Sequence, residues 1–531
     1  MKNQRQLMIL GLIILAAVFF RFYGLPQQGL FFFDEGHMIY KAFLIQQTFT
    51  DHSKLLSYAS NIDSKSLWIL CVSFLQWVFK AKWPVHLPVQ VFSAFFGILT
   101  VILTYLFAKK YFKSETIGLT SAFFLALSSY HIFYSRLVLA ESICIFLSML
   151  SLVTYLKSFE DNKGREKFLI LAGLIAGSAF LFNHYRVTLL PVFILLLECE
   201  NSWKGSFRSC CFNKSASRFL VFLLALLIVL LGGQILNSLF MLGGVYISSY
   251  FAALTANISS HSFSFLDLRE IPLFAIYLYE YEGALSLFLL AVGLFILRKF
   301  PRLLLPVCFL FLQIFASSFV NEKGARSLAI VLPFYSMISG AVLIYLFTQW
   351  RKKALFIMII ICLGILALVD RSSKACSILT FQSDMPKAVA YLNRYYPQSS
   401  LLTTNRPLVA AYAPDRQILN LSRISYQELP VLLKENYQVI VIDPQKLIDS
   451  RMGEHWAFLD TPMVDPIEEY CQPVKTFDHF NNLLFERFLF DHALNWRATL
   501  DILKGRSQNA GKIEIYELKS CLSELKNHLS L

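Results

Sequence analysis

Long apolar runs recur along the first 370 residues of this sequence, separated by short polar loops. A helix needs about 20 apolar residues to cross the hydrocarbon core of a bilayer. The runs are close to that length, so we expect about eleven transmembrane helices. Their predicted ranges are 7–23, 87–108, 116–131, 140–157, 168–183, 187–199, 218–236, 281–297, 303–319, 327–348 and 354–370.

The pattern changes over residues 371–531, where proline, asparagine and charged residues occur throughout and the apolar runs become amphipathic. Ser425 and Glu428 form an S-x-x-E capping box at the start of a helix. Residues 438–442 are typical of a buried strand, and residues 512–518 alternate as a β-strand does. We therefore predict an all-α membrane domain over residues 1–370, followed by an α/β domain over residues 371–531.

The composition agrees with a membrane protein, because 56% of the 531 residues are hydrophobic and the mean hydropathy is +0.55. Residues 7–20 follow Lys2 and Arg5 as in a signal peptide, but no small-x-small cleavage site precedes Arg21, so we expect a retained first span. The formal net charge of +13 comes largely from basic residues in short loops. Membrane topology explains such residues, and we expect no nucleic-acid partner.

The short apolar run from Ser66 to Phe79 decides on which side of the membrane every later loop lies. It is bounded by lysines and contains Trp68 and Trp77, which is typical of a helix in the membrane interface. If it does not cross, five basic clusters face the cytoplasm, as the positive-inside rule requires; if it crosses, all five lie outside. We therefore expect an interfacial helix, a cytoplasmic N-terminus and an extracytoplasmic C-terminal domain, in the inner or plasma membrane of the cell. The clusters lie at 109–113, 157–167, 204–218, 298–302 and 351–353.

The ten cysteines form no C-x-x-C pair and show no spacing typical of a zinc or redox site. Cys376, Cys471 and Cys521 fall in the C-terminal domain, and the odd count leaves a disulfide among them undecided. The histidines near the predicted interfaces are isolated, and an isolated histidine is more often structural than a ligand. We expect neither a metal nor a cofactor.

The first predicted outer loop places Asp34 and Glu35 directly after three phenylalanines, close to the membrane surface. Ionised groups at such a position are costly unless they are paired or functional. Asp34 has an alternative role as the N-cap of a helix over residues 35–46, and the two roles are compatible.

Later loops on the same predicted face carry further charged residues. Arg136 in the second loop is followed five residues later by Glu141. Both have structural alternatives, because Arg136 can extend to the lipid head groups and Glu141 can sit favourably at a helix N-terminus. An arginine binds phosphate oxygens bidentately, and a nearby carboxylate can accept a proton from an attacking hydroxyl or amine. Two more clusters suited to an anionic lipid head group are His184, Tyr185 and Arg186, then Lys323 and Arg326.

The order of these parts resembles the type C glycosyltransferase superfamily, in particular bacterial relatives of protein O-mannosyltransferases and of lipid A aminoarabinose transferase. The likeness covers the first 350 residues or so and is carried by the Asp34–Glu35 pair, the interfacial helix, and Arg136 with Glu141. A basic residue before a leucine- and proline-bearing span, here Arg326, is also similar. Two features depart from the family pattern: residues 63–67 replace a His-Pro-Pro run, and Glu141 stands where Asp is frequent.

This resemblance implies an inverting transfer of a hexosyl or pentosyl group from a polyprenyl-phosphate sugar. Asp34 is implied as the general base, with Glu35 and Glu141 orienting the acceptor or steadying the positive charge at the anomeric carbon. Arg136, Arg186 and Arg326 are implied to bind the donor phosphate. We add His184, Tyr185 and Lys323 as substrate-binding residues. The expected partners are the lipid-linked donor, membrane lipids, and an acceptor that is a protein, a lipid or a glycan.

Two other classes of function remain open on the sequence alone. A transporter or flippase of lipid-linked sugars also needs basic residues and a groove for an amphiphile. Transporters usually bind their substrate near the middle of the spans, however, where this sequence shows neither charges nor broken helices. The other is a scaffold without catalysis, whose outer domain binds a partner.

Overall fold

The structure is a computed structural model. In it the chain forms two compact units. The first unit comprises residues 1–23, 51–71 and 90–379, and the second comprises 24–50, 72–89 and 380–531. The residues that the structure describes are 2–31, 33–50, 66–79, 84–160, 163–203, 209–240, 271–318, 325–350, 354–380, 382–421, 424–443, 463–480 and 511–528.

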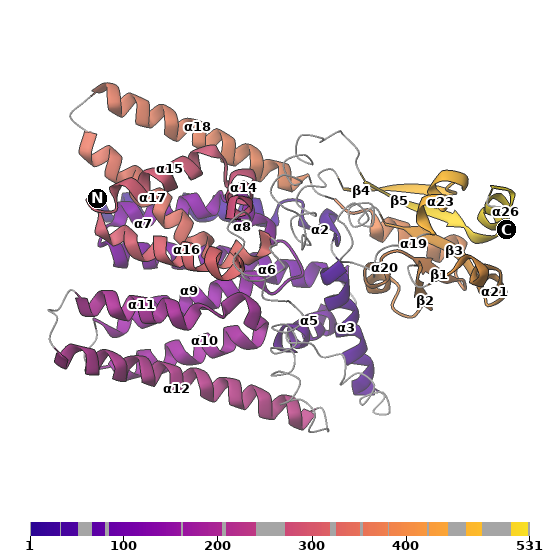
Figure 1. Cartoon of the computed structure of the whole chain (residues 1–531), viewed down its shortest axis with the longest axis horizontal. Coiled ribbons are helices and arrows are strands. Elements are labelled where there is room, and N and C mark those ends of the chain that lie inside the picture. The colour runs from indigo at the N-terminus through magenta and orange to yellow at the C-terminus, as the bar shows by residue number, and fades with distance from the viewer. Residues whose placement is uncertain are drawn as a thin grey trace. The chain divides into compact units, whose positions relative to one another are not determined.

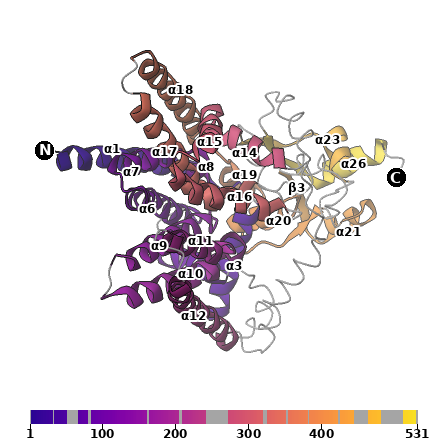
Figure 2. The same ribbon diagram turned by 60° about the vertical axis from the view of Figure 1, so that its left-hand side comes forward.

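The first unit is helical. Figures 1 and 2 both show α10 lying between α9 and α12, and α7 beside α17. Its described helices are α1 (Lys2–Phe22), α6 (Leu87–Phe112), α7 (Glu115–Ala126), α8 (Ser129–Tyr134), α9 (Glu141–Ser158), α10 (Arg165–Val187), α11 (Leu190–Trp203), α12 (Ser209–Phe240), α14 (Ile271–Glu282), α15 (Ala284–Ile296), η3 (Pro301–Leu303), α16 (Leu304–Ser318), η4 (Ala325–Val331), α17 (Leu332–Trp350) and α18 (Ala354–Leu379).

Seven helices in the described ranges are long and apolar enough to cross a membrane, and three shorter helices are also apolar. The protein is therefore a multi-pass membrane protein. All eleven predicted spans fall on helical segments, although their number in the membrane stays a prediction.

Two of the predicted spans are interrupted. The range 116–131 breaks after Ala126, because the Ser128 hydroxyl accepts a hydrogen bond from the His131 amide, 3.1 Å away, and caps the new helix α8. The range 281–297 breaks at Gly283, which separates α14 from α15 with a φ of 86°. A Cβ at this position would clash with the Asp370 carboxylate. Hydropathy does not register such breaks, since they depend on single capping or left-handed residues.

The predicted helix at Ser66–Phe79 is present with those bounds as α5. Its 14 residues extend over about 21 Å, which is shorter than the hydrocarbon core of about 30 Å. Leu70, Phe74 and Trp77 form an exposed apolar stripe at helical spacing, while Trp68 is buried on another side. This distribution agrees with an interfacial position, which stays a prediction.

The second unit contains a five-stranded mixed sheet, so the predicted α/β fold is confirmed. The strands are β1 (Ser400–Thr403), β2 (Ile418–Asn420), β3 (Tyr437–Ile442), β4 (Lys475–Phe480) and β5 (Gly511–Glu517), in the order β2-β1-β3-β5-β4. Strands β2, β1 and β3 are parallel, and β5 is antiparallel to β3 and β4. The accompanying helices are α2 (Leu25–Gln28), α3 (Phe33–Thr50), α19 (Met385–Tyr395), α20 (Arg406–Tyr412), η6 (Tyr426–Glu428), α21 (Leu429–Lys434), α23 (Val464–Tyr470) and α26 (Leu518–His528).

Local signals in the sequence explain the elements around this sheet. The predicted capping box is present, with the Glu428 carboxylate accepting from the Ser425 amide at 2.6 Å, and it opens η6, which continues into α21. In the sheet, β1 lies between β2 and β3. The connection from β1 to β2 therefore runs in one direction along the sheet, and the connection from β2 to β3 runs in the opposite direction. With right-handed connections, α20 and α21 therefore cover opposite faces of the sheet.

The hydrophobic core under α21, α23 and α26 is closed by a disulfide. Cys471 at the end of α23 and Cys521 in α26 are joined across 50 residues of sequence, and both are buried. Cys376 is free and exposed. The three-dimensional structure thus resolves the pairing that the count of three cysteines left undecided.

We predict that the double substitution Cys471→Ala and Cys521→Ala destabilises the C-terminal part of the chain by about 4 kcal/mol, because a 50-residue loop loses its cross-link. Thermal unfolding of the full-length protein in detergent measures the effect. Cys376→Ser is the matched control and should leave the melting temperature unchanged. An equal melting temperature for the double variant and the native protein would contradict the prediction.

Candidate functional site

Three polar side chains meet in the first unit around the first residue of α9. The Glu141 Oε1 atom accepts hydrogen bonds from Arg186 Nε, at 3.1 Å, and from Arg326 Nε. The Glu141 side chain is fully buried, whereas 8% of the Arg326 side chain and 22% of the Arg186 side chain are exposed. The structure thus brings together one predicted carboxylate and two predicted arginines from segments far apart in sequence.

Irregular backbone brings both arginines to Glu141. Asn183 has a non-helical conformation, with φ −165° and ψ 92°, so α10 kinks just before the turn that carries Arg186. Arg326 lies in η4, a buried 3-10 segment that precedes α17. Glu141 itself is in the first turn of α9, where the helix dipole favours a negative charge.

Among the described residues, two guanidinium groups share one carboxylate in this cluster, so their formal charges sum to a net positive charge. Its positive field reaches Tyr134, a buried residue of α8: burial raises the pKa of this hydroxyl, while Arg326 lowers it and Glu141 raises it. A buried group of one excess positive charge is expensive in a weakly polar environment. Such a group is suited to an anionic ligand, and a phosphate matches the planar N–H donors of arginine.

Arg136 has a different surrounding. Its Nη1 atom donates to the carbonyl oxygens of Phe20, at 3.1 Å, and Tyr23, at 2.8 Å, which lie at the C-terminal end of α1. Burial lowers the pKa of Arg136 to about 10, so the side chain is still cationic at neutral pH. The alternative in which Arg136 extends to lipid head groups is wrong, because the residue is fully buried. Capping a helix C-terminus with a cation is favourable.

Asp34 and Glu35 lie in the first turn of α3, in the second unit. The helix begins at Phe33, so Asp34 is inside the first turn and the alternative that makes it the N-cap is wrong. Glu35 instead provides the local stabilisation: its buried carboxylate Oε2 accepts a hydrogen bond from the Phe31 amide at 3.0 Å. Asp34 is partly exposed.

The C-terminal part of the chain packs directly against α3. A Cβ on Gly36 would lie 2.6 Å from the Leu408 Cα and 2.7 Å from the Pro407 carbonyl oxygen, so only glycine permits this close approach of α3 and α20. The end of α2 is held too, because the Ser383 amide donates to the Gln28 carbonyl oxygen at 2.8 Å. The segment that carries both predicted carboxylates is thereby positioned by residues more than 300 positions later in the sequence (Figure 1).

Tyr412 and His86 complete this arrangement. The Tyr412 hydroxyl accepts a hydrogen bond from the Leu30 amide at 3.0 Å and forms a second one with His86 Nδ1 at 3.1 Å. Burial lowers the pKa of His86 to about 4, so its neutral ring can accept this hydrogen bond at pH 7. Burial, and after it the charge of Glu35, raises the pKa of Tyr412 well above its ordinary value. Neither residue was predicted, and no motif in the sequence marks them.

Three predicted substrate-binding residues lie wholly or partly outside the described part of the chain. Lys323 lies outside the described residues, as do the side chains of His184 and Tyr185, whose backbone belongs to α10. Within the described ranges, no group of three or more His, Cys, Asp or Glu side chains could hold a metal ion. The expectation that neither metal nor cofactor is needed stays a prediction.

Solved structures share this architecture. AglB, an archaeal oligosaccharyltransferase from Archaeoglobus fulgidus in complex with an inhibitory peptide and a dolichol-phosphate, matches with a TM-score of 0.57, 14% identity, and coverage of 88% of this chain and 72% of its own. ArnT from Cupriavidus metallidurans matches in the apo state with a TM-score of 0.56 at 10% identity, covering 85% of this chain and 95% of its own. Bound to undecaprenyl phosphate, ArnT matches with a TM-score of 0.53 at 11% identity, covering 96% and 98%. The chain has the fold of the type C glycosyltransferases.

A family model points the same way. The model of dolichyl-phosphate-mannose-protein mannosyltransferases matches residues 85–232, a range that contains Arg136, Glu141 and Arg186. No curated protein sequence shows a significant match to the chain. The family match and the type C fold together support a membrane glycosyltransferase.

We predict that Glu141→Ala destabilises the protein by about 3 to 5 kcal/mol, because Arg186 and Arg326 lose the buried carboxylate they share. The comparison variant is Glu160→Ala, which removes the pair of this exposed carboxylate with Lys110 and should cost less than about 1 kcal/mol. Thermal unfolding in detergent distinguishes the two. Equal losses for both variants would show that the Glu141 pairs contribute no more than surface pairs.

A second prediction concerns pH. The folded protein holds His86 with a pKa of about 4, against 6.5 ordinarily, so the unfolded chain takes up this proton first. The contribution of His86 to the free energy of unfolding is therefore complete above pH 6.5 and falls as the pH drops from 6.5 toward 4, by about 3 kcal/mol in all. His86→Asn keeps an acceptor near the Nδ1 position without titrating, and should flatten the stability profile in this interval. Superimposable profiles for native protein and variant would rule out the shifted histidine.

Proposed function

We propose that the protein is an inverting glycosyltransferase that moves a sugar from a polyprenyl-phosphate donor to an acceptor on the outer face of the membrane. The observation that carries this proposal is the net positive cluster of Arg186 and Arg326 around the buried Glu141. Solved neighbours of the same fold bind phosphate-bearing lipids: dolichol-phosphate in AglB and undecaprenyl phosphate in ArnT.

In this proposal the two arginines bind the donor phosphate and stabilise it as a leaving group. Glu141 is a positioning residue, because it contacts both Nε atoms and fixes the planes of both guanidinium groups. Arg136 acts indirectly, through the end of α1 that it caps. His184, Tyr185 and Lys323 are proposed as further contacts to the donor.

Asp34 is proposed as the general base. An acceptor hydroxyl or amine attacks the anomeric carbon and forms the new glycosidic bond, the bond from that carbon to the phosphate oxygen breaks, and the acceptor proton passes to the Asp34 carboxylate. The lipid phosphate leaves with the electron pair of the broken bond. The partial exposure of Asp34 and the rigid start of α3 support this role, since Glu35 and the packing at Gly36 fix the backbone on which Asp34 lies.

The proposal includes a membrane orientation with the N-terminus in the cytoplasm and the C-terminal domain outside, in the inner or plasma membrane. The positive-inside rule supports it, provided that α5 lies in the interface. The donor and the acceptor would then meet on the outer face.

We predict that Asp34→Asn lowers sugar transfer by at least about 100-fold without changing the melting temperature, because only the proton acceptor is lost. The assay supplies labelled polyprenyl-phosphate sugars to the purified protein with membrane extract as the source of acceptor. Asp384→Asn is the matched control. It removes a carboxylate of the same unit that pairs, among the described residues, with the exposed Lys387, and it should retain full transfer.

Unchanged transfer by Asp34→Asn would remove this residue from the role of base. If the native protein transfers none of the donors but moves a fluorescent lipid-linked sugar across reconstituted vesicles, the transport function replaces the proposed one.

A further inference from the structure

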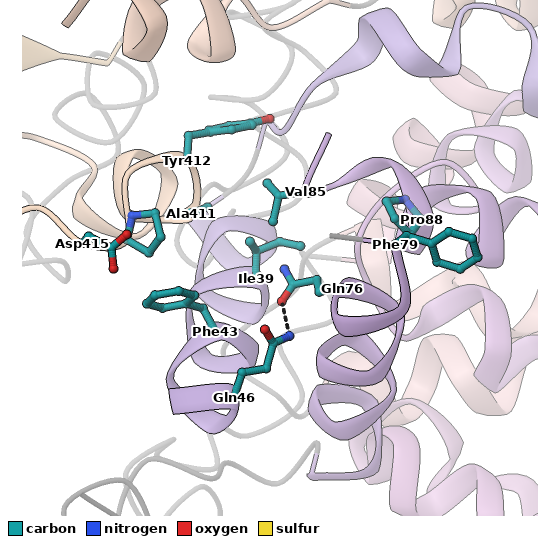
Figure 3. Close-up of a pocket in the computed structure, with 11 residues that line it drawn as sticks. Ile39, Phe43, Gln46, Gln76, Phe79, Val85, Pro88, Ala411, Tyr412 and Asp415 are labelled. Atoms are coloured by element: carbon teal, nitrogen blue, oxygen red, sulfur yellow. Dashed lines mark hydrogen bonds between the residues drawn. The ribbon is translucent and has the colours of Figure 1, made fainter. Parts of the chain in front are cut away.

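The second unit contains a pocket of about 360 Å³ that the proposed chemistry does not yet use. Its walls come from α3, the end of α5, the residues at the start of α6, and α20 with the turn after it (Figure 3). All lining residues belong to the second unit. The volume is in the range of pockets that bind small organic ligands.

The wall formed by α3 continues from the carboxylates in its first turn. Ile39, Phe43 and Gln46 line the pocket at helical spacing, and Glu35 stands one turn before Ile39 on the same stripe of the helix. Along the helix axis the pocket begins about 6 Å from Glu35. A ligand in this pocket therefore lies close to the turn that carries Asp34.

Two glutamines provide the polar groups inside. Gln46 Nε2 donates to the Ser73 carbonyl oxygen at 2.8 Å and to Gln76 Oε1 at 3.4 Å. Gln76 is only 6% exposed, and no described group accepts a hydrogen bond from its Nε2. Figure 3 shows this amide turned toward Ile39 and Gln46 inside the pocket. A buried donor without an acceptor costs free energy, which a ligand oxygen would recover.

The remaining lining identifies the kind of ligand. No lining residue is cationic, and the one carboxylate, Asp415, is exposed at the edge, so the pocket does not suit a phosphate. The lining also includes three aromatic residues, Phe43, Phe79 and Tyr412. Amide groups that donate and accept, combined with aromatic walls, match a sugar ring, whose hydroxyls hydrogen-bond and whose C–H faces pack on aromatic side chains.

We propose that this pocket binds an uncharged, hydroxyl-rich part of the acceptor, a sugar ring, and presents it beside the first turn of α3. This inference rests on the proposed function, because the ligand is an acceptor only if the protein transfers sugar. The binding of a sugar ring in the pocket does not depend on catalysis. The donor phosphate and the acceptor sugar would thus be recognised by different chemistry: guanidinium groups for the former, amides and aromatic rings for the latter.

The test is saturation-transfer NMR on the full-length protein in a detergent without a sugar head group. The probes are methyl α-D-mannopyranoside and methyl α-D-glucopyranoside, with glycerol 3-phosphate as an anionic probe. Gln76→Leu removes the donor, and it leaves Gln46 bonded to the Ser73 carbonyl oxygen, so the fold is retained. Ala411→Phe fills the pocket from α20. Gln438→Leu changes an exposed glutamine of β3 and is the control.

We expect at least one methyl glycoside to bind the native protein and Gln438→Leu equally, about five- to tenfold more weakly to Gln76→Leu, and not at all to Ala411→Phe. Asp34→Asn should bind the glycoside as the native protein does, because binding does not need the proton acceptor. If the native protein binds the glycoside but transfers no sugar, the proposed function is refuted and the pocket proposal stands. Equal binding by native protein and both pocket variants, no binding of either glycoside, or preferred binding of glycerol 3-phosphate would each overturn the pocket proposal.

Discussion

The buried carboxylate of Glu141 determines where three segments of the first unit meet. In a membrane environment neither this carboxylate nor the arginines beside it can be left without a partner, because the surrounding medium solvates charge poorly. The kink at Asn183 in α10 and the 3-10 segment η4 are departures from ideal helix, and both bring an arginine to Glu141. The electrostatic requirement thus accounts for local backbone features that hydrophobic packing alone would not produce.

A comparable constraint holds the second unit together. Helix α3 carries the carboxylates close to its start, and it buries Met38, Ala42 and Ile45 at helical spacing. Its position depends on the close backbone approach at Gly36, the hydrogen bonds of the Tyr412 hydroxyl, and the contact between Gln28 and Ser383. The C-terminal α/β domain therefore has a function within the chain itself, since it positions the segment proposed to carry the general base.

In the proposals above, the first unit binds the anionic part of the donor and the second unit binds an uncharged part of the acceptor. In the first unit, Arg186 comes from the end of α10 and Arg326 from the 3-10 segment η4, and both suit a phosphate leaving group. In the second unit, the pocket presents amides and aromatic rings, with no cation among its lining residues. A transferase that binds an anionic lipid and a neutral acceptor benefits from this separation, because each substrate is disfavoured at the other's contacts.

The sequence by itself determined the features that depend on local pattern. Hydropathy located the apolar helices, a short apolar run located β3, and alternation located β5. The capping box located the start of η6, and the charged residues on one predicted face included Glu141, Arg186 and Arg326. Only the tertiary structure decided the features that depend on distant partners. These are the capping of α1 by Arg136, the choice of Cys471 and Cys521 for the disulfide, and the contacts of Tyr412 and Gln76 around α3. The physical reason is that such contacts join residues tens to hundreds of positions apart, whose meeting depends on the path of the backbone between them and leaves no periodic trace in the sequence.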